Sequence, residues 1–451
     1  MQREQLSSRL GFLMLSAGCA IGVGNVWKFP WLTGQNGGGI FVLVYLCFLI
    51  LLGLPVMTME FSVGRAAQKS PVCMYQQIEP AGSKWHWHGY AALVGNVVLM
   101  MFYSVVSGWM LYYLVSSASG ALASLDAKEV GGFFGAMLSS APTVTFYTVI
   151  TVIGAFVILS FPLRTGLETV SKWMMGLLFV LMVFLAVHSL FLDGAREGLT
   201  FYLLPDFSKF TSSTVVAAMN QAFFSLSIGI GSMAIFASYI NKDQSLVKES
   251  ASVIALDTVV AVLAGLIIFP ACFTYGVKPT AGPSLIFEAL PTIFHEMAFG
   301  RVWGSFFFLF MTFATFSTVL AVCEAILSCV RDLTNWSRPK ASLICCVTVA
   351  VLSLPCALGF NVLSDFHPLG PGTVVLDLED FIVSNILLPL GSLCFVLFCT
   401  HKSGWGWSNY MKEVNSGKGL KMPNFMRFYC TWILPLIILS VFVLGMIPFF
   451  K

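Results

Sequence analysis

Long apolar segments recur along the whole chain and limit what it can fold into. A helix that crosses a bilayer needs about 20 mostly apolar residues, and eleven segments joined by short loops meet that requirement. Only 10% of the 451 residues are charged, whereas a soluble protein usually carries about a quarter. The sequence therefore predicts an all-α integral membrane protein with eleven transmembrane helices. The predicted segments are 10–33, 38–62, 88–118, 142–161, 168–192, 214–239, 250–275, 302–330, 341–359, 377–400 and 429–449.

The distribution of positive charge predicts an orientation. Loops rich in Lys and Arg stay in the cytoplasm, and most of the 24 Lys and Arg residues lie in the loops and flanks on the side of the amino terminus. We expect a multi-pass protein of the cell membrane, inner or plasma, with a cytoplasmic amino terminus and an external carboxyl terminus. The outer side would hold only Lys28, Lys128, Arg196, Lys209, Lys278, Arg301 and Lys451.

Charge and cysteine usage exclude several classes of partner. The net charge of +3 is small and scattered, so we expect no nucleic acid. No cleavage site follows the first apolar run, which we interpret as a retained span. Most of the twelve cysteines lie in apolar runs without a CxxC pair, so no disulfide framework is expected. Nothing in the sequence indicates an obligate protein partner.

Two of the predicted spans carry residues that disfavour a helix near mid-depth. The stretch 17–25 contains three glycines and an asparagine, and the stretch 225–231 contains two glycines and two serines. Glycine costs about 1 kcal/mol in a helix interior, so both stretches are predicted to unwind. Irregular backbone in a bilayer is tolerated only where it is buried or lines a cavity. Close helix packing is the alternative for either stretch alone, but their matching positions favour a binding site.

The two interrupted segments also predict a repeat. Segment 6 opens a second group of five segments as segment 1 opens the first, which indicates a 5+5 repeat with one extra helix. The predicted units are 1–192, 193–401, and 402–451, the last comprising a cytoplasmic loop and the eleventh helix. Broken helices offer positive half-helix amino termini to a carboxylate and free carbonyls to a cation. This arrangement is typical of a transporter.

Several motifs are shared with a known family. They are the run from Ser16 to Trp31, the stretch from Asn36 to Glu60, 220–227, 237–239, the loop 282–287 and the stretch from Asp380 to Leu390. Through these motifs most of the chain resembles the neurotransmitter:sodium symporter family, in particular its bacterial amino-acid transporters with the LeuT-type inverted repeat. Eleven helices rather than the usual twelve is a departure that some bacterial members share, and it leaves a dimer contact through a twelfth helix in doubt.

The resemblance implies a symporter that imports neutral hydrophobic or aromatic L-amino acids with sodium by alternating access. Na⁺ prefers oxygen ligands, and two sodium sites are implied. The first would use the carbonyl of Ala20, the side chains of Asn25, Ser225 and Asp257, and the substrate carboxylate. The second would use the carbonyls of Gly18, Ile21 and Ala314 with the hydroxyls of Ser317 and Thr318, although these two hydroxyls could instead serve helix packing.

The resemblance also implies a substrate site. The carboxylate would bind the 20–24 backbone and Tyr103, and the ammonium would bind carbonyls such as those of Phe224 and Ser227. The implied walls are apolar, so a charged substrate side chain would be costly. Leucine-sized and aromatic substrates both remain open. The implied set is Ala20, Gly24, Leu99, Tyr103, Phe224, Ser225, Ser227, Ile230, Thr318 and Val322, each of which could alternatively be core packing.

Asp257 bears on the ions that are moved. A lone carboxylate deep in a span is expensive unless a cation accompanies it, with a structural hydrogen bond as the alternative. Chloride-dependent members resemble this site but carry Asn here and Ser one turn later, whereas this chain has Asp257 and Ala261. We therefore expect no chloride requirement. Protonation of Asp257 on the empty return step would give proton counter-transport.

Gates are implied on both sides of the site. Outside, Lys28 would pair with Asp380, above a lid of Tyr103 and Phe224. Lysine stands here where many members have arginine, so the fork-like double hydrogen bond is lost. Inside, Arg3 would pair with Asp332, although Arg3 could instead be a topology determinant. The implied supports of the inner gate are Ser238, Tyr239 and Glu324.

Other functional classes fit less well. For an intramembrane enzyme, His295-Glu296 lacks the second histidine of a HExxH site and no Gly-x-Ser-x-Gly motif is present. A sodium channel usually needs several repeats around its filter. A proton-coupled amino-acid transporter of the same fold remains the main alternative, and Asn25 and Asp257 favour sodium over it. A purely structural subunit would not need polar groups at mid-depth.

Overall fold

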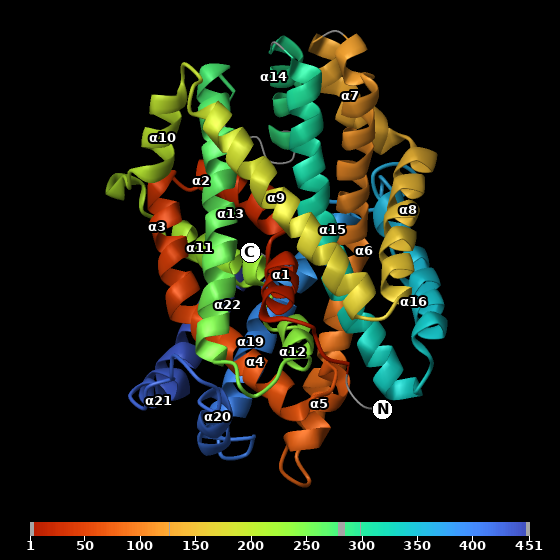
Figure 1. Cartoon of the computed structure of the whole chain (residues 1–451). Coiled ribbons are helices and arrows are strands. Elements are labelled where there is room, and N and C mark those ends of the chain that lie inside the picture. Colours follow the sequence, from red (N-terminus) through yellow and green to blue (C-terminus); the bar gives the residue numbers. More distant parts are fainter. Residues whose placement is uncertain (1–3, 126, 278–284, 298, 448–451) are drawn as a thin grey trace.

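The computed structural model describes residues 4–125, 127–277, 285–297 and 299–447, to which the following account refers. In these ranges the chain forms a bundle of helices without β-strands (Figure 1). Two isolated backbone bridges, Gly38 with Pro205 and Gln244 with Lys418, join loops to the bundle.

Nine helical segments of the described residues are long and apolar enough to cross a membrane. Each corresponds to one segment predicted from hydropathy. They are Gly39–Ala67 (α3 Gly39–Phe48, η2 Leu49–Gly53, α4 Leu54–Ala67), α6 His86–Ser119, α8 Ala141–Ser160, Arg164–Ser189 (η4 Arg164–Glu168, α9 Thr169–Ser189), α13 Leu246–Thr274, α15 Gly300–Thr334, Arg338–Leu358 (α16 Arg338–Leu352, α17 Leu354–Leu358), Val375–Thr400 (α18 Val375–Phe381, η7 Ile382–Leu387, α19 Leu388–Thr400) and Met426–Met446 (α21 Met426–Phe428, η8 Tyr429–Ile433, α22 Leu434–Met446).

The two remaining predicted segments are interrupted. Helix α1 (Arg9–Ala20) is followed after a short break by η1 (Gly24–Lys28) and α2 (Phe29–Gln35), and the two parts are bent by 52°. Counted as one span, this pair makes ten in the described residues. The other segment consists of α11 (Ser212–Leu226) and the short α12 (Ser232–Ala237).

Shorter helices lie outside the predicted spans. In Figure 1, α5 and α20 lie at the lower end of the bundle, and α7 and α14 lie at the upper end. Their length explains why a search for apolar runs of about 20 residues does not find them. These elements are α5 Pro71–Ile78, η3 Leu122–Ser124, α7 Ala127–Ser139, α10 Ala195–Leu203, η5 Phe207–Lys209, η6 Leu285–Ala289, α14 Leu290–Glu296 and α20 Trp407–Val414.

Helix α1 lies inside the bundle. It packs against α9, α13 and α15, and it also contacts α12. Helix α6 runs along α15, and α8 and α9 pack against the same helix (Figure 1). The two interrupted segments therefore meet at the centre, enclosed by long helices that have no such break.

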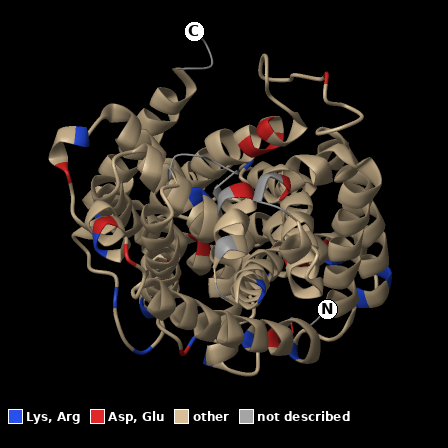
Figure 2. Cartoon of the chain, turned by 90° about the horizontal axis from the view of Figure 1, so that it is seen from above, with Lys and Arg blue, Asp and Glu red and all other residues tan. Residues whose placement is uncertain are grey.

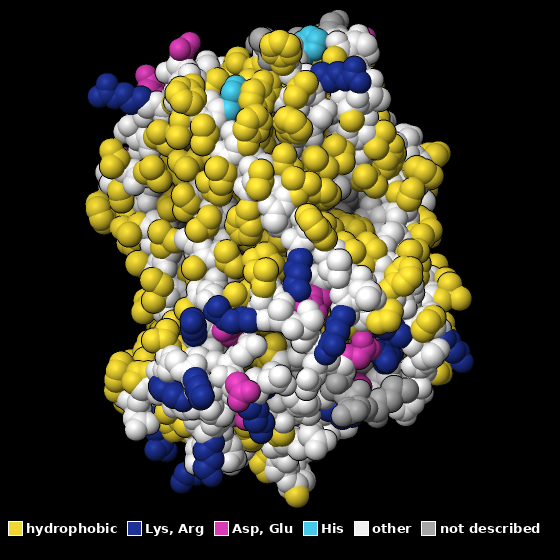
Figure 3. Space-filling model, in the orientation of Figure 1, with side chains coloured by type: hydrophobic (Ala, Val, Ile, Leu, Met, Phe, Trp, Pro, Cys, Tyr) yellow, Lys and Arg dark blue, Asp and Glu magenta, His cyan; other side chains and the backbone are white. Residues whose placement is uncertain are grey.

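The outer surface of the bundle is largely apolar. Large side chains such as Trp173, Phe184 and Val347 face outward, and hydrophobic side chains cover a broad region of the face in Figure 3. Lys and Arg gather toward the lower end, and seen from above few positions of the bundle carry charge (Figures 2 and 3). Such a surface is stable in contact with lipid rather than water.

Candidate functional site

The breaks in the two interrupted segments lie against each other. After α1 the backbone of Ile21 is extended, with ψ 103°. After α11 three residues have positive φ, namely Ser227 (50°), Gly229 (101°) and Gly231 (75°), a conformation that glycine adopts easily and serine rarely. The Ser227 hydroxyl donates to the carbonyl of Cys19 at 3.1 Å. The breaks thus place free backbone groups from both segments at one location.

Glu60 of α4 holds the second break in place. Its side chain is fully buried and accepts hydrogen bonds from the backbone N–H groups of Gly229, Met233 and Ala234 at 2.9, 3.0 and 3.4 Å. A carboxylate at the start of α12 satisfies donors that otherwise have no partner and is favoured by the helix dipole. Sequence reasoning did not assign this role, although a lone carboxylate within an apolar span was a usable signal.

We expect Glu60→Ala to destabilise the folded bundle. Three buried N–H groups would lose their acceptor at about 1–3 kcal/mol each, which should lower the melting temperature in detergent by roughly 5–10 °C. Glu60→Gln keeps one acceptor oxygen and should give an intermediate value. Glu197→Ala, on the exposed face of α10, is the control. An unchanged melting temperature for Glu60→Ala would show that this contact does not support the break.

The side chains expected at the first sodium site lie together. Asn25 donates through Nδ2 to Asp257 Oδ1 at 2.7 Å and to the Asp257 carbonyl at 3.1 Å. Tyr45, which was not predicted, lies 2.9 Å from Ser225 Oγ and donates to Asp257 Oδ2 at 3.2 Å. All four side chains are buried, and Asn25 Oδ1 has no hydrogen-bond partner. Ala20, the last residue of α1, lines the adjacent cavity.

This cluster has the chemistry of a cation site. Asp257 is fully buried, and its partners described above are neutral. A buried carboxylate without a positive partner is costly, and an orphaned amide oxygen next to it adds a further unsatisfied acceptor. A hard monovalent cation would satisfy both groups, since it binds carboxylate, amide, hydroxyl and carbonyl oxygens.

The groups expected at the second sodium site also lie together. Thr318 Oγ1 lies 3.2 Å from the carbonyls of Gly18 and Ile21 and 3.5 Å from that of Ala314. Ser317 Oγ donates to the Ala314 carbonyl at 2.9 Å. Several carbonyls converge on one hydroxyl, which can donate only one proton. The arrangement therefore offers more acceptors than the protein itself satisfies, as a cation site requires.

A small cavity lies between these two clusters. Eight of the ten residues expected at the substrate site line it, namely Ala20, Gly24, Leu99, Tyr103, Phe224, Ser227, Ile230 and Thr318. Ser225 and Val322 are buried but do not line it. Gly22, part of the 20–24 backbone expected at the substrate carboxylate, also lines it, as do Cys19, Val383 and Leu388, which were not predicted.

The central cavity is closed. Its volume is about 10 Å³, roughly the space needed for one water molecule. Tyr103 Oη accepts a hydrogen bond from the N–H of Val23 at 2.8 Å, so this side chain is tied to the first break. A larger cavity lies elsewhere in the bundle, but the convergence of broken backbone and buried oxygens makes the central cavity the candidate site. A ligand larger than water would enter only after the surrounding helices move.

The residues expected at the outer gate lie together beside this cavity. Lys28 Nζ lies 3.1 Å from both carboxylate oxygens of Asp380, and it lies 4.1 Å from the centre of the Phe224 ring. Ser384, not predicted, donates to Asp380 Oδ1 at 2.6 Å. Tyr103 and Phe224 are buried beneath this pair.

The residues expected at the inner gate are only partly brought together. Arg3 lies outside the described residues. Asp332 accepts a hydrogen bond from the Ser70 N–H at 2.8 Å, and Tyr239 donates to Glu324 at 2.7 Å. Ser238 donates to the carbonyl of Ile235, within its own segment, at 2.6 Å.

Other polar contacts lie at the lower end, and sequence reasoning did not find them. Each joins a residue before α1 or at its start to a neighbouring helix. Arg338 also pairs with Glu324 at 2.5 Å, so the predicted Tyr239 and Glu324 belong to the same network. The closing contacts are Glu4 with Arg331 at 3.2 Å and Arg338 at 3.5 Å, Arg9 with Glu249 at 2.7 Å, and Ser7 with Glu168 at 2.5 Å.

We expect Glu4→Gln to loosen this lower closure. Burial raises the pKa of Glu4, but the Leu163 N–H and the guanidinium groups of Arg338 and Arg331 outweigh burial and hold the pKa below its usual value. The carboxylate is therefore charged at neutral pH. Removing a part-exposed charge lowers the stability of the closure only a little. The amide of Leu6, which donates to the carbonyl of Tyr239 at 3.2 Å, reports on this segment. It should exchange with deuterium about two- to fivefold faster in the variant.

The same prediction has a pH signature. A lowered pKa contributes stability that is present above the ordinary value near 4.5 and is lost only as the pH falls through the lower value. After correction for intrinsic exchange, the exchange rate of the Leu6 amide in Glu4→Gln is divided by its rate in wild type. This ratio should be the same at pH 6 and pH 8. Asp365→Asn, exposed at the other end, should exchange as wild type does. A ratio of one at both pH values would show that Glu4 does not hold the segment.

Comparison with known proteins places these features in a family context. Residues 3–129 and 134–451 match the model of the sodium:neurotransmitter symporter family. The chain is 34% identical to an uncharacterized sodium-dependent transporter, YhdH, of Bacillus subtilis, over 99% of this chain and 98% of that protein. It is 26% identical to the sodium-dependent serotonin transporter of Drosophila melanogaster, over 99% of this chain and 77% of that protein.

A solved structure has the same fold. The crystal structure of MhsT in complex with L-phenylalanine matches with a TM-score of 0.89 and 36% sequence identity, over 98% of this chain and 99% of that chain. The prediction of an all-α, multi-pass membrane protein with a LeuT-type fold is thereby confirmed. Because the family match spans nearly the whole sequence, this chain belongs to the sodium:neurotransmitter symporter family, which is a family of membrane transporters and not of enzymes.

Proposed function

We propose that this protein is a sodium-coupled symporter that imports neutral hydrophobic or aromatic amino acids by alternating access. The observation that carries the proposal is the pair of buried oxygen clusters, around Asp257 and around Thr318, on either side of an apolar cavity. One cluster contains a fixed negative charge and an orphaned acceptor. Two sodium ions, one in each cluster, account for the two groups of buried oxygen atoms.

The substrate class follows from the walls of the cavity. Leu99, Phe224 and Ile230 line it, and among the described residues no Lys, Arg, Asp or Glu does. A charged substrate side chain would therefore be desolvated without a partner. The substrate carboxylate lies against the break after α1 and beside Tyr103, near the Asp257 cluster. A carboxylate ligand supplied by the substrate couples its binding to that of the first sodium ion. The related MhsT is described with L-phenylalanine, which fits the aromatic end of this class.

Transport proceeds by opening one closure at a time. We assign the upper closure to the ion pair of Lys28 with Asp380 and the lower closure to the ion pairs of Glu4 and Arg9. Both closures belong to segment 1, since Lys28 follows its break and Arg9 precedes it. Movement of the two halves of segment 1 relative to each other therefore opens either side. Cation and substrate together favour the closed form because they bind groups on both sides of the break.

The topology of this transporter follows from the same elements. We take α11 and α12 together as an eleventh span whose break, like that of α1 and α2, lies near mid-membrane. The repeats are 1–192 and 193–401, with 402–451 as an added loop and helix. Lys and Arg gather at the lower end (Figure 3), which we assign to the cytoplasm with the amino terminus. The carboxyl terminus is then external, and the protein lies in the cell membrane.

Uptake into proteoliposomes tests the proposal. A mixture of labelled amino acids is presented with an inward sodium gradient, with choline and proton gradients as matched controls. Leucine-like or aromatic amino acids should accumulate only with sodium, and the flux should saturate with substrate. Accumulation driven by protons alone would favour a proton-coupled transporter, and sodium flux without substrate would favour a channel. Absence of accumulation by folded protein under each gradient would overturn the substrate class.

Chloride independence is tested in the same vesicles. The carboxylate of Asp257 supplies a fixed negative charge at the cation cluster, so no anion needs to enter with the ions. Replacing chloride with gluconate should leave sodium-driven uptake within about twofold of its original rate. A dye that reports internal pH would show the proton leaving if Asp257 is protonated on the return step. A steep loss of uptake in gluconate would contradict this part of the proposal.

A further inference from the structure

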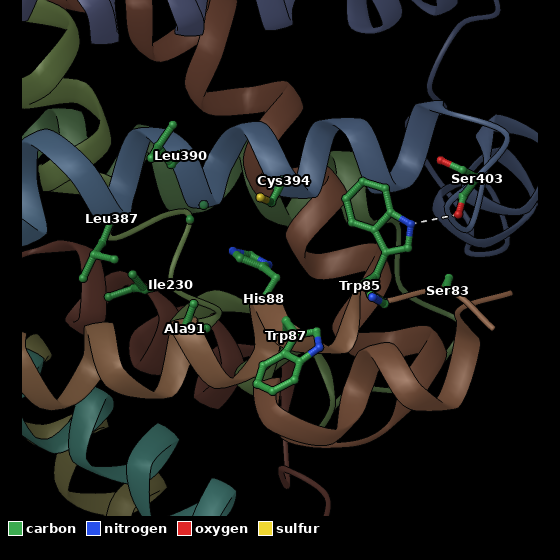
Figure 4. Close-up of a pocket in the computed structure, with 14 residues that line it drawn as sticks. Ser83, Trp85, Trp87, His88, Ala91, Ile230, Leu387, Leu390, Cys394 and Ser403 are labelled. Carbon is green, nitrogen blue, oxygen red and sulfur yellow. Dashed lines mark hydrogen bonds between the residues drawn. The ribbon is translucent and has the colours of Figure 1, made fainter. Parts of the chain in front are cut away.

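A second cavity lies away from the central site. It has a volume of about 690 Å³ and lies between the start of α6 and α19 (Figure 4). This volume falls within the range of roughly 300–1,000 Å³ that is usual for ligand pockets. Neither sodium cluster is part of it. The cavity is therefore separate from both proposed sodium sites.

The walls of this lateral cavity are apolar. Trp87 and Ala91 of α6 line one side, and Leu390 and Cys394 of α19 line the other (Figure 4). His88 lies between these walls, and its Nδ1 is 2.6 Å from the hydroxyl of Tyr75, so one of its polar atoms already has a partner. An apolar chain can fill such a space without leaving many polar groups unsatisfied.

The cavity opens toward the membrane at its lower part. Trp87 and Ala91, both on a helix that crosses the membrane, line it and are exposed. Below them Trp85 donates through Nε1 to the carbonyl of Ser403 at 2.8 Å, which joins the start of α6 to the loop after α19 (Figure 4). Trp87 and Ala91 thus make the cavity accessible from the side of the bundle, and the loop residues Ser83, Lys84 and Ser403 line its lower end, so a lipid can enter with its headgroup at that end.

The rim of the opening is positively charged. Lys84 precedes Trp85 and Lys402 precedes Ser403, and both lysines are exposed. The nearby acid Glu79 is already engaged by His86 at 2.7 Å and by Ser83 at 2.7 Å. Exposed lysines beside tryptophans are typical of the membrane interface, and lysines there attract anionic lipid headgroups.

We propose that the lateral cavity binds an anionic phospholipid, with one acyl chain between α6 and α19 and the headgroup against Lys84 and Lys402. The apolar walls fit the chain, the charged rim fits the headgroup, and the sideways opening admits both from the membrane. One lipid molecule matches all three features, whereas a ligand without an apolar chain would leave the walls unfilled.

The bound chain would touch the substrate site through a shared wall. Ile230 lines the lateral cavity on one side and the central cavity on the other. Its carbonyl accepts a hydrogen bond from Asn96 Nδ2 of α6 at 2.7 Å, so the wall is fixed to the same helix that lines the lipid site. A chain that fills the lateral cavity supports the second break from behind. This effect on transport rests on the proposed function, whereas lipid binding itself does not.

Native mass spectrometry of the purified full-length chain tests the binding. The protein is titrated with palmitoyl-oleoyl phosphatidylglycerol or with the zwitterionic phosphatidylcholine of the same chains. Wild type should bind the anionic lipid at least fivefold more tightly. Ala91→Trp fills the cavity and should weaken this binding at least fivefold, whereas Val94→Trp, exposed on the same helix but not lining the cavity, should not. Cys394→Phe fills the cavity from α19 if Ala91→Trp fails to fold.

Charge reversal separates headgroup from chain. In Lys84→Glu with Lys402→Glu the preference for phosphatidylglycerol should fall to within about twofold of phosphatidylcholine. The matched control, Lys412→Glu with Lys418→Glu, changes the net charge equally at the same end and should keep the preference. A loss caused by cavity filling without an effect of charge reversal would overturn the anionic lipid in favour of any apolar chain. Equal lipid binding by wild type, Ala91→Trp and Cys394→Phe would show that lipid does not bind in this cavity.

A transport measurement then separates the two proposals. Uptake is compared in vesicles of phosphatidylcholine with and without phosphatidylglycerol. The uptake rate of wild type and of Val94→Trp should change when the anionic lipid is added. The uptake rate of Ala91→Trp should stay the same. If lipid binds as proposed but no amino acid accumulates, the transport assignment fails while the lipid site stands. If uptake proceeds and no lipid binds, the lipid site fails while the transport assignment stands.

Discussion

Replacing Asp257 with asparagine should abolish sodium-driven uptake at physiological sodium while leaving the bundle folded. The two side chains have nearly the same size, and Asn can still accept from Asn25 Nδ2, which lies 2.7 Å from Asp257 Oδ1. The fixed negative charge is what disappears. At an effective dielectric constant near 20 an ion pair at contact is worth on the order of 4 kcal/mol, and hydrogen bonds to charged groups contribute about 1.5–3 kcal/mol.

The measurement is the sodium concentration at half-maximal uptake. A loss of about 2–4 kcal/mol corresponds to a roughly 30- to 1,000-fold increase. Asp193→Asn removes a carboxylate from an exposed loop and should leave this concentration unchanged. Melting temperatures of both variants report whether folding is affected. A wild-type sodium dependence in Asp257→Asn would mean that the buried carboxylate serves the structure and binds no transported cation.

The long helices could be predicted from sequence because the bilayer imposes a length. An apolar run of about 20 residues has few alternatives in a membrane, and the nine uninterrupted spans fall where hydropathy places them. Short helices such as α5 and α20 could not be found this way. They lie at the ends of the bundle, where water and tertiary packing replace the lipid constraint, and no minimum length applies.

The sequence could indicate where the helices are weak, but not which groups hold the chain there. Glycine and serine within the stretches 17–25 and 225–231 signal weak helices from local propensity alone. Glu60 and Gln221 reach these breaks from elsewhere, Glu60 through the N–H of Gly229 and Gln221 through the carbonyl of Gly24 at 2.7 Å. Such contacts join residues far apart in sequence, and only the packing of the helices brings them together.

The contacts of the lower closure were also not predictable from local sequence. Resemblance to a family supplied the pairing of Arg3 with Asp332, and Arg3 lies outside the described residues. The ion pairs of Glu4 and Arg9 depend on the path of the few residues before α1. No periodicity constrains such a segment, because its position is set by charges on other helices.

The second large effect is expected at Gly22, which the sequence analysis included in the 20–24 backbone expected at the substrate carboxylate and counted among the residues that weaken the helix. A Cβ atom at this position would lie 2.0 Å from Tyr103 Oη and 2.5 Å from Thr318 Oγ1. These two groups belong to the proposed substrate and sodium sites. Gly22→Ala must therefore displace both, and displacement of Tyr103 also removes the acceptor of the Val23 N–H.

We expect Gly22→Ala to weaken binding of the transported amino acid by about 100-fold, since overpacking costs about 1–3 kcal/mol and the lost hydrogen bond a further 1–3 kcal/mol. Equilibrium binding of the labelled amino acid that wild type accumulates gives the value. Gly176→Ala is the control, because a Cβ at that helical position meets no atom within 4 Å, and it should bind as wild type. Wild-type affinity in Gly22→Ala would show that Tyr103 and Thr318 do not approach this backbone when substrate is bound, and the substrate would then have to lie elsewhere in the bundle.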